Sequence, residues 1–337
     1  MKALVHTKPF GLEYVDVNSP VRKEGEVLIK IASVGICGSD IHGYSGESGR
    51  RIPPIIMGHE ASGIVTDVGE NSRFNPGDRV CVDSTIYCGL CEFCIKQKVN
   101  LCSDRKVIGV SCEEYYRDGA MAEYISVPER IVYKINDSIS MDDAALIEPA
   151  SVAYHSISLS QFNKDDTIMV VGAGIIGLSI IQVLKMRGCN EIISVDINDS
   201  RLDVAKFYGA DYLINPQREN KSQKINKGVD IAFEAVGINS TVNYCIDSVK
   251  KSGKVILVGN VQQNVTFPLQ KIVTRELIIL GSCAISGEYP EVIRDLTDGK
   301  INFDKIVTST ASLSHGKQWF DELSSGKHNQ IKVILNP

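Results

Sequence analysis

Several features that would assign a protein to a class are absent from this sequence of 337 residues. Positive charge is not in excess: the net charge is −5 and the pI is about 5.8, so the chain lacks the charge pattern of proteins that bind nucleic acid or anionic membranes. No run of about 18 apolar residues occurs, and the first residues, MKALVHTKPF, contain no apolar leader with a cleavage site. Internal repeats and low-complexity linkers are missing as well. We therefore expect a cytoplasmic globular protein.

The composition that is present suits a globular protein with two domains. Hydrophobic residues make up 43 % and charged residues 23 %, and the chain is longer than the length at which a single core usually stops growing. Residues 1–150 consist of short apolar runs broken by glycine and proline, which predicts antiparallel strands. From about residue 165 apolar strands alternate with helical stretches, which predicts a parallel sheet covered on both faces. The closing segment, NQIKVILN, could return to the first domain.

Four of the ten cysteines lie in one short segment, YCGLCEFCIKQKVNLC. In a reducing compartment such a cluster indicates metal ligands rather than disulfides. Four thiolates complete a tetrahedral zinc shell and leave no position for water or substrate, so we predict a structural zinc, with an iron–sulfur cluster as the alternative. The predicted ligands are Cys88, Cys91, Cys94 and Cys102.

A glycine-rich turn, VVGAGIIG, follows a predicted strand and opens a predicted helix. Gly172 permits the tight turn, Gly174 lets the backbone approach a pyrophosphate, and Gly177 lets helix and strand pack closely. Asp196 ends the next strand, where a carboxylate binds the adenosine ribose hydroxyls and repels a 2′-phosphate, so NAD is favoured over NADP. Arg201 could stack on the adenine or cap a surface helix. The cofactor-binding residues that we predict are Gly172, Gly174, Ile176, Gly177, Asp196, Arg201, Val258 and Gly259.

Two segments of the first half, GICGSDIHGY and MGHEASG, contain the reactive candidates. One thiolate, Cys37, and one imidazole, His59, with carboxylates such as Asp40 and Glu60 nearby, supply the mixed set of three protein ligands that a catalytic zinc with an open position needs. Taken alone, Cys37 is more typical of a buried core thiol, and His59 of a hydrogen-bonded loop residue. Glu148, in ALIEPAS, we place at a strand end where the pattern changes; a helix-terminal acid before Pro149 is the plainer interpretation.

In their order, the motifs GICGSDIH, GHEASG, NPGDRV, the four-cysteine segment, DGAMAEY, IEP and VGAGIIG resemble those of the zinc-containing medium-chain alcohol dehydrogenases. The resemblance runs from MKALV to VILNP. It implies an α/β protein with a GroES-like β-barrel catalytic domain at 1–150, which carries the structural zinc lobe at about 86–104. It also implies a doubly wound, NAD-binding Rossmann domain at 151–285, a segment at 286–337 that rejoins the catalytic domain, an active site in the cleft, and a homodimer or homotetramer.

Carried over by position, the resemblance implies that Cys37 and His59 hold the catalytic zinc. Alcohol-specific members of the family have a cysteine where this sequence has Glu148, so the chain is similar to the polyol, sugar-phosphate and threonine dehydrogenase branch. In that branch Glu60 and Glu148 share the remaining ligand position, and the sequence leaves the choice between them open.

The implied reaction is hydride transfer from an alcohol carbon to the nicotinamide, with a zinc ion that lowers the pKa of the alcohol. Ser39 is the implied first proton acceptor. His42 matches the residue that ends the proton relay in many relatives, and an imidazole suits that task because it exchanges protons near neutral pH. As the alternative, His42 is an exposed turn residue.

The implied substrate is a small molecule, a polyol, polyol phosphate or sugar acid, oxidised at a secondary alcohol. Arg50 and Arg51 could meet a phosphate or carboxylate, although solvated loop charges are more common. Ser282, Cys283 and Ala284 are small where polyol relatives often carry an arginine or a large aromatic residue, which argues against a sorbitol-type assignment. Two alternatives are an NAD enzyme for threonine, butanediol or a simple alcohol or aldehyde, and a non-enzymatic regulator that binds zinc and NAD.

Overall fold

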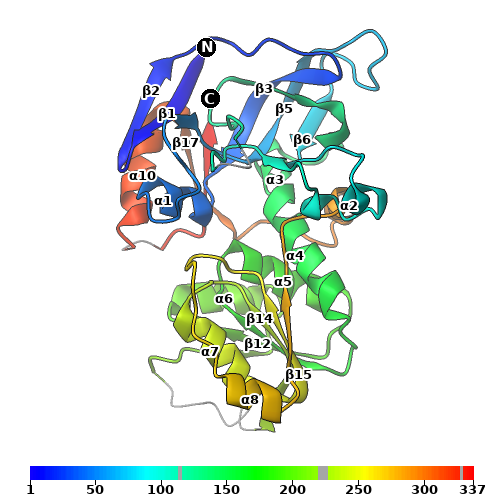
Figure 1. Cartoon of the computed structure of the whole chain (residues 1–337), viewed down its shortest axis with the longest axis vertical. Helices are drawn as coiled ribbons and strands as arrows, with labels where there is room; N and C mark the ends of the chain where they lie inside the picture. Colours follow the sequence, from blue (N-terminus) through cyan, green and yellow to red (C-terminus); the bar gives the residue numbers. More distant parts are fainter. Residues whose placement is uncertain (113–115, 219–226, 327–328) are drawn as a thin grey trace. The chain divides into compact units, whose positions relative to one another are not determined.

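The structure is a computed structural model, which describes residues 1–112, 116–218, 227–326 and 329–337. These residues form two compact units, one made of Met1–Glu148 with Ile285–Pro337 and the other of Pro149–Ala284. Figure 1 labels α5 to α8 in the second unit. No helix in the described ranges is long and apolar enough to cross a membrane.

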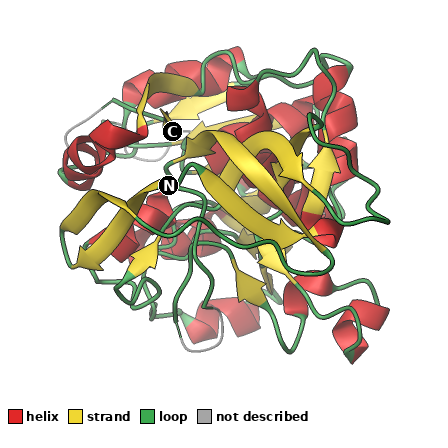
Figure 2. Ribbon diagram, turned by 90° about the horizontal axis from the view of Figure 1, so that it is seen from above, coloured by secondary structure: helices red, strands yellow, loops and turns green. Residues whose placement is uncertain are grey.

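The first unit contains three β-sheets, and all of their strand pairs are antiparallel except that of β17 with β18. The largest sheet has the order β10-β6-β5-β3-β18-β17, with β9 also paired to β3, and smaller sheets are formed by β2-β1-β4 and β7-β8. Both termini belong to this unit, and Figure 2 marks where they lie. The strands are β1 (Lys2–Lys8), β2 (Gly11–Asp16), β3 (Glu26–Gly35), β4 (Ile55–Ile56), β5 (Glu60–Asp67), β6 (Arg79–Val82), β7 (Thr85–Ile86), β8 (Lys106–Val107), β9 (Tyr124–Pro128), β10 (Val132–Lys134), β17 (Val307–Ser312) and β18 (Lys332–Asn336).

Short helices connect these strands. The helical elements of the first unit are α1 (Gly38–Tyr44), α2 (Glu92–Ile95), α3 (Met141–Ala145), α9 (Tyr289–Thr297), α10 (Gly316–Ser324) and the 3₁₀ turns η1 (Val99–Leu101), η2 (Glu129–Ile131) and η4 (Leu313–His315). Helix α4 (Ile147–Ser160) begins at the end of the first unit and runs into the second.

Strand β3 is an inner strand of the largest sheet, between β5 and β18. In its sequence, EVLIKIASVG, every second side chain from Val27 to Ile31 faces the core. Val27, Ile29 and Ile31 are buried, whereas Lys30, between Ile29 and Ile31, is exposed. At its end β3 pairs antiparallel with two strands at once, so that Gly35 lies opposite Glu60 of β5 and Ile334 of β18. This register brings a segment from the end of the chain next to the turn that follows β3.

The second unit is a doubly wound parallel sheet. Its strand order is β13-β12-β11-β14-β15-β16, and every strand pair is parallel. The order reverses beside β11, as in Rossmann folds. This confirms the predicted fold class. The elements are β11 (Thr167–Val171), α5 (Ile175–Met186), β12 (Glu191–Val195), α6 (Asp199–Phe207), β13 (Tyr212–Ile214), β14 (Val229–Glu234), α7 (Asn239–Ser248), β15 (Val249–Leu257), α8 (Leu269–Thr274) and β16 (Ile278–Gly281).

The placement of Glu148 at a strand end is wrong. Glu148 is the second residue of α4, which begins at Ile147. Pro149 is accepted there because the first turn of a helix has no intrahelical partner for its backbone N–H groups. The plainer interpretation, an acid at a helix terminus, is therefore the right one for the backbone.

Candidate metal centres and dinucleotide site

Three ligand types meet in the first unit at the turn after β3. Cys37 precedes α1 as its N-terminal capping residue, while His59 and Glu60 lie at the start of β5. The pairing of Gly35 with Glu60 brings the two segments together. One ligand atom from each of Cys37, His59 and Glu60 lies within 4.8 Å of the others. A thiolate, an imidazole and a carboxylate at this spacing fit a zinc ion and leave room for one more ligand.

Glu60 also takes part in a buried ion pair that the sequence analysis missed. The Lys332 ammonium donates to both Glu60 carboxylate oxygens, Oε1 at 2.8 Å and Oε2 at 2.7 Å, and to the Ile36 carbonyl at 2.9 Å. The Lys332 and Glu60 side chains are 1 % and 0 % exposed. The available signal was a lysine followed directly by three apolar residues, in KVILN, since lysine is almost never fully buried unless it is paired.

Glu148 lies outside the three-residue cluster but interacts electrostatically with it. Its Oε1 accepts a hydrogen bond of 2.8 Å from the Ser84 hydroxyl. Burial raises the pKa of Glu148 to about 7; the Glu60 charge acts in the same direction and the His59 charge opposes it. Glu148 therefore interacts by charge with both Glu60 and His59, which makes it a second carboxyl group of this site.

Asp40 contacts two members of the cluster, Cys37 and His59. Its Oδ2 accepts the Cys37 backbone N–H at 3.2 Å, and its Oδ1 lies 3.4 Å from His59 Nδ1. Burial alone would raise the pKa of Asp40, but the His59 and Arg51 charges hold it well below its usual value. Burial lowers the pKa of His59, yet the Asp40 and Cys37 anions raise it well above its ordinary value.

The structure places the two arginines differently from each other. Arg50 is exposed, as the solvated alternative predicts, whereas Arg51 is buried and its Nη2 donates to Asp40 Oδ1 at 2.9 Å. The same Nη2 donates to Ser39 Oγ at 3.2 Å. Ser39 and His42 are three residues apart on α1 and so share one helix face. For Arg51 the description as a solvated loop charge is wrong.

The four-cysteine segment forms a second group around α2. The Sγ atoms of Cys88, Cys91, Cys94 and Cys102 all lie within 4.8 Å of one another. Cys88 Sγ accepts the backbone N–H groups of Leu90 and Cys91, each at 3.4 Å. Backbone N–H donors lower the pKa of Cys91 to about 6, whereas burial raises the pKa of Cys94 to about 12, so the thiolate is favoured at Cys91 but not at Cys94. Four sulfur ligands fit a closed zinc site.

The glycine turn of the second unit has the geometry expected of a phosphate loop. Gly172 has a φ of 99°, and a Cβ on Gly177 would lie 1.8 Å from the Gly172 carbonyl oxygen. Both positions therefore require glycine. Asp196 accepts the Ala173 N–H at 2.7 Å through Oδ2 and the Asn198 N–H at 2.9 Å through Oδ1. The carboxylate is thus fixed against the turn, and each oxygen keeps a lone pair for a further donor.

The other predicted cofactor residues lie in two places. Ile176 is on the first turn of α5, and Arg201 is on α6 with its N–H directed to Asn198 Oδ1 at 3.4 Å. Val258 and Gly259 follow β15, and both of their N–H groups donate to the Glu234 carbonyl at 2.9 Å. Because β15 runs parallel to β11 in the same sheet, with β14 between them, Val258 and Gly259 follow a carboxyl end at the same edge of the sheet as the glycine turn.

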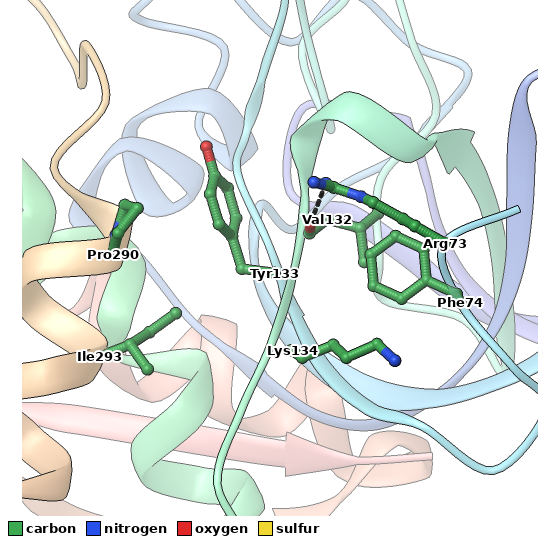
Figure 3. Close-up of a pocket in the computed structure, with 7 residues that line it drawn as sticks. All are labelled: Arg73, Phe74, Val132, Tyr133, Lys134, Pro290 and Ile293. Carbon is green, nitrogen blue, oxygen red and sulfur yellow. Dashed lines mark hydrogen bonds between the residues drawn. The ribbon is translucent and has the colours of Figure 1, made fainter.

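A separate pocket of about 390 Å³ lies on the first unit away from these residues. Figure 3 shows Arg73 with its guanidinium on the Val132 carbonyl, 2.9 Å away, and Lys134 directed to the opposite side. Lys134 pairs with Asp78 at 2.7 Å. Arg73 and Lys134 already have partners, and no predicted site residue lines this pocket. We therefore assign no function to it.

Comparison with known proteins assigns the family. Residues 23–137 match the alcohol dehydrogenase GroES-like domain, and residues 176–298 match the zinc-binding dehydrogenase domain. The chain belongs to the zinc-binding alcohol dehydrogenase family and is an alcohol oxidoreductase. The predicted family and class of enzyme are confirmed.

The similarity extends to particular relatives over nearly the whole length. The chain is 34 % identical to D-arabitol-phosphate dehydrogenase of Enterococcus avium, with 96 % of this chain and 93 % of the relative covered. It is 34 % identical to sorbitol dehydrogenase of Bacillus subtilis (strain 168), with 100 % and 97 % covered. The crystal structure of galactitol-1-phosphate dehydrogenase from Escherichia coli superposes with a TM-score of 0.91 at 28 % identity, over 100 % of both chains.

Proposed function

We propose that this enzyme oxidises a secondary alcohol of a polyol, polyol phosphate or sugar acid, with NAD as the hydride acceptor. The observation that carries the proposal is the meeting of Cys37, His59 and Glu60 within 4.8 Å, with Glu148 beside them. This mixed ligand set suits a catalytic zinc that keeps an open position. Similarity to relatives named as polyol and polyol-phosphate dehydrogenases supports the class of substrate.

Different residues of the chain are proposed to bind the zinc, to balance charge and to transfer the proton. A zinc ion supplies Lewis acidity that lowers the pKa of an alcohol. Cys37, His59 and Glu60 hold it, Glu148 supplies the second carboxylate, and Lys332 balances the charge of Glu60. Ser39 accepts the alcohol proton and His42, on the same face of α1, passes it to solvent.

The second unit is proposed to bind NAD at its glycine turn. The N-terminus of α5 offers free N–H groups to the pyrophosphate, Asp196 accepts the ribose hydroxyls, and Arg201 stacks on the adenine. Val258 and Gly259 line the nicotinamide end. In this proposal residues 1–150 and 286–337 form the catalytic domain and residues 151–285 the NAD domain.

A second zinc is proposed for the four-cysteine group, in a structural role, because four thiolates leave no open position. Free thiolates persist in a reducing compartment, which supports a cytoplasmic location. By resemblance to its family the enzyme is proposed to be a homodimer or homotetramer.

The substrate class is tested with a panel of hexitols, hexonates and polyol phosphates, alongside threonine, butanediol and simple alcohols. The rate of NADH formation is followed by its absorbance with zinc-loaded enzyme. We expect the highest kcat/KM within the polyol, polyol-phosphate and sugar-acid group. A higher kcat/KM for threonine or butanediol would overturn the substrate class, and no NADH from any compound would overturn the proposed activity.

Replacing Asp196 with alanine is expected to reduce the preference for NAD over NADP by at least about tenfold, because the repulsion of a 2′-phosphate is lost. The measurement is kcat/KM for each cofactor at one saturating alcohol concentration. Asp203, an exposed acid of α6, is the control, since its replacement by alanine is expected to leave the ratio unchanged. An unchanged ratio in Asp196→Ala would remove Asp196 from cofactor selection.

A further inference from the structure

Arg51 is an unusual residue for a connecting loop, because its charged group is buried. It lies between α1 and β4, and its side chain is 2 % exposed. A Cβ on Gly43 would lie 2.1 Å from Arg51 Cγ, so the arginine stem rests directly on α1 at a position that only glycine allows. Lying on α1, the guanidinium reaches the Asp40 carboxylate, which is itself 0 % exposed.

Asp40 carries this contact to the proposed zinc ligands. Its carboxylate accepts the Cys37 N–H and lies against the His59 ring, at 3.2 Å and 3.4 Å. Within the described residues, His59 Nδ1 is buried without a hydrogen bond of good geometry. Because Nδ1 faces Asp40, Nε2 is the nitrogen left for a metal. A metal-bound histidine commonly donates its other N–H to a carboxylate, which fixes the ring.

The charges explain why an arginine is needed behind this carboxylate. A histidine that binds zinc is neutral, so it cannot balance the charge of Asp40. A buried carboxylate without a cation is strongly unfavourable. Arg51 remains charged at all relevant pH values and approaches Asp40 Oδ1 at 2.9 Å. It therefore holds the Asp40 carboxylate in place and balances its charge when His59 is neutral.

We propose that Arg51 is a positioning residue that fixes the His59 ring for the catalytic zinc through Asp40. This inference rests on the proposed zinc site at Cys37, His59 and Glu60. It assigns a role to Arg51, which contacts the ligand His59 only through Asp40. Arg51 is not one of the proposed ligands, so the property that tests this role is metal affinity. Turnover alone does not test it, because Arg51 Nη2 also donates to Ser39 Oγ, the proposed proton acceptor.

The experiment measures zinc transfer from the holoenzyme to a chromophoric chelator. Arg51→Met keeps the apolar stem on Gly43 and removes the charge. We expect one of the two zinc ions to bind about 10–100-fold more weakly, the range found when a residue behind a metal ligand is lost. The other zinc, held by the four cysteines, keeps its wild-type affinity. Arg51→Lys restores part of the loss, because it returns the charge without the planar fork.

Arg50→Met is the matched control, since Arg50 is the exposed neighbour in the same loop, and it keeps both zinc affinities. A double-mutant cycle with Asp40→Asn tests the route. In the Asp40→Asn background, Arg51→Met causes no further weakening if Arg51 acts through Asp40. The double variant removes both buried charges together. It therefore shows whether Arg51 acts through Asp40 even if Arg51→Met alone folds poorly.

Two results would overturn the inference: wild-type zinc affinity in Arg51→Met, or full additivity of the two substitutions. The proposed function fails differently. If the wild-type enzyme holds only one zinc, and Cys91→Ser but not Cys37→Ser removes it, then the catalytic site itself is wrong, whatever Arg51 does.

Discussion

We expect Cys37→Ser to lose turnover while the fold survives. Losing a residue behind a metal ligand already costs about 10–100-fold in activity, so losing a ligand is expected to lower kcat/KM by more than about a hundredfold. Zinc analysis is expected to find one zinc fewer per chain. The Cys37 thiol lies at the start of α1 and is half-buried, so a serine fits there without a cavity.

The matched variant is Cys91→Ser, in the four-cysteine group. It is also expected to lose one zinc, but its main effect is on stability, because that metal ties together a short irregular segment. The two variants thus separate a loss of chemistry from a loss of structure. Full activity in Cys37→Ser would contradict its assignment, and a stable but inactive Cys91→Ser would contradict the structural role.

Replacing Lys332 with methionine is expected to lower the free energy of unfolding of the first unit by about 3–5 kcal/mol. The substitution leaves the Glu60 carboxylate, 0 % exposed, as a buried charge without its partner. Unfolding in urea can be followed by the fluorescence of Trp319, the single tryptophan, which packs against the core of this unit. Adding Glu60→Gln is expected to restore much of the stability.

Lys30→Met is the control for that measurement. Lys30 is an exposed residue of β3 in the same sheet, and surface substitutions of this kind usually change stability by less than about 0.5 kcal/mol. If Lys332→Met were no more destabilising than Lys30→Met, the ion pair with Glu60 would not be needed to stabilise the buried carboxylate.

The sequence predicted best where the chemistry is local. Gly172 and Gly177 lie in one turn, and the reasons for glycine at each position follow from backbone geometry alone. The four cysteines are likewise close along the chain, so their spacing indicated a common metal. For Cys37 and His59 the sequence offered residue types, and only the resemblance to a family indicated that they meet.

The buried partners of the site could not be predicted from local pattern. Lys332 is 272 positions from Glu60, and only the pairing of β18 with β3 brings it there. Arg51 has the sequence context of a solvated loop, next to the exposed Arg50. Its side chain can be buried because Gly43, which has no Cβ, leaves room for it on α1. No periodic pattern in the sequence indicates this contact. Long-range charge pairs of this kind become visible only with the tertiary fold.

The pairing of β18 with β3 also sets an order of events during synthesis. The ribosome makes the complete second unit, Pro149–Ala284, before it makes the strand that neutralises Glu60. Because domains generally fold as units while the chain emerges, the second unit can fold while the first still lacks its last strand and buried cation. A nascent chain that stops before Lys332 therefore lacks both the strand that completes the sheet and the cation that Glu60 needs for burial, so we expect its first unit to stay incompletely folded until the last residues are made.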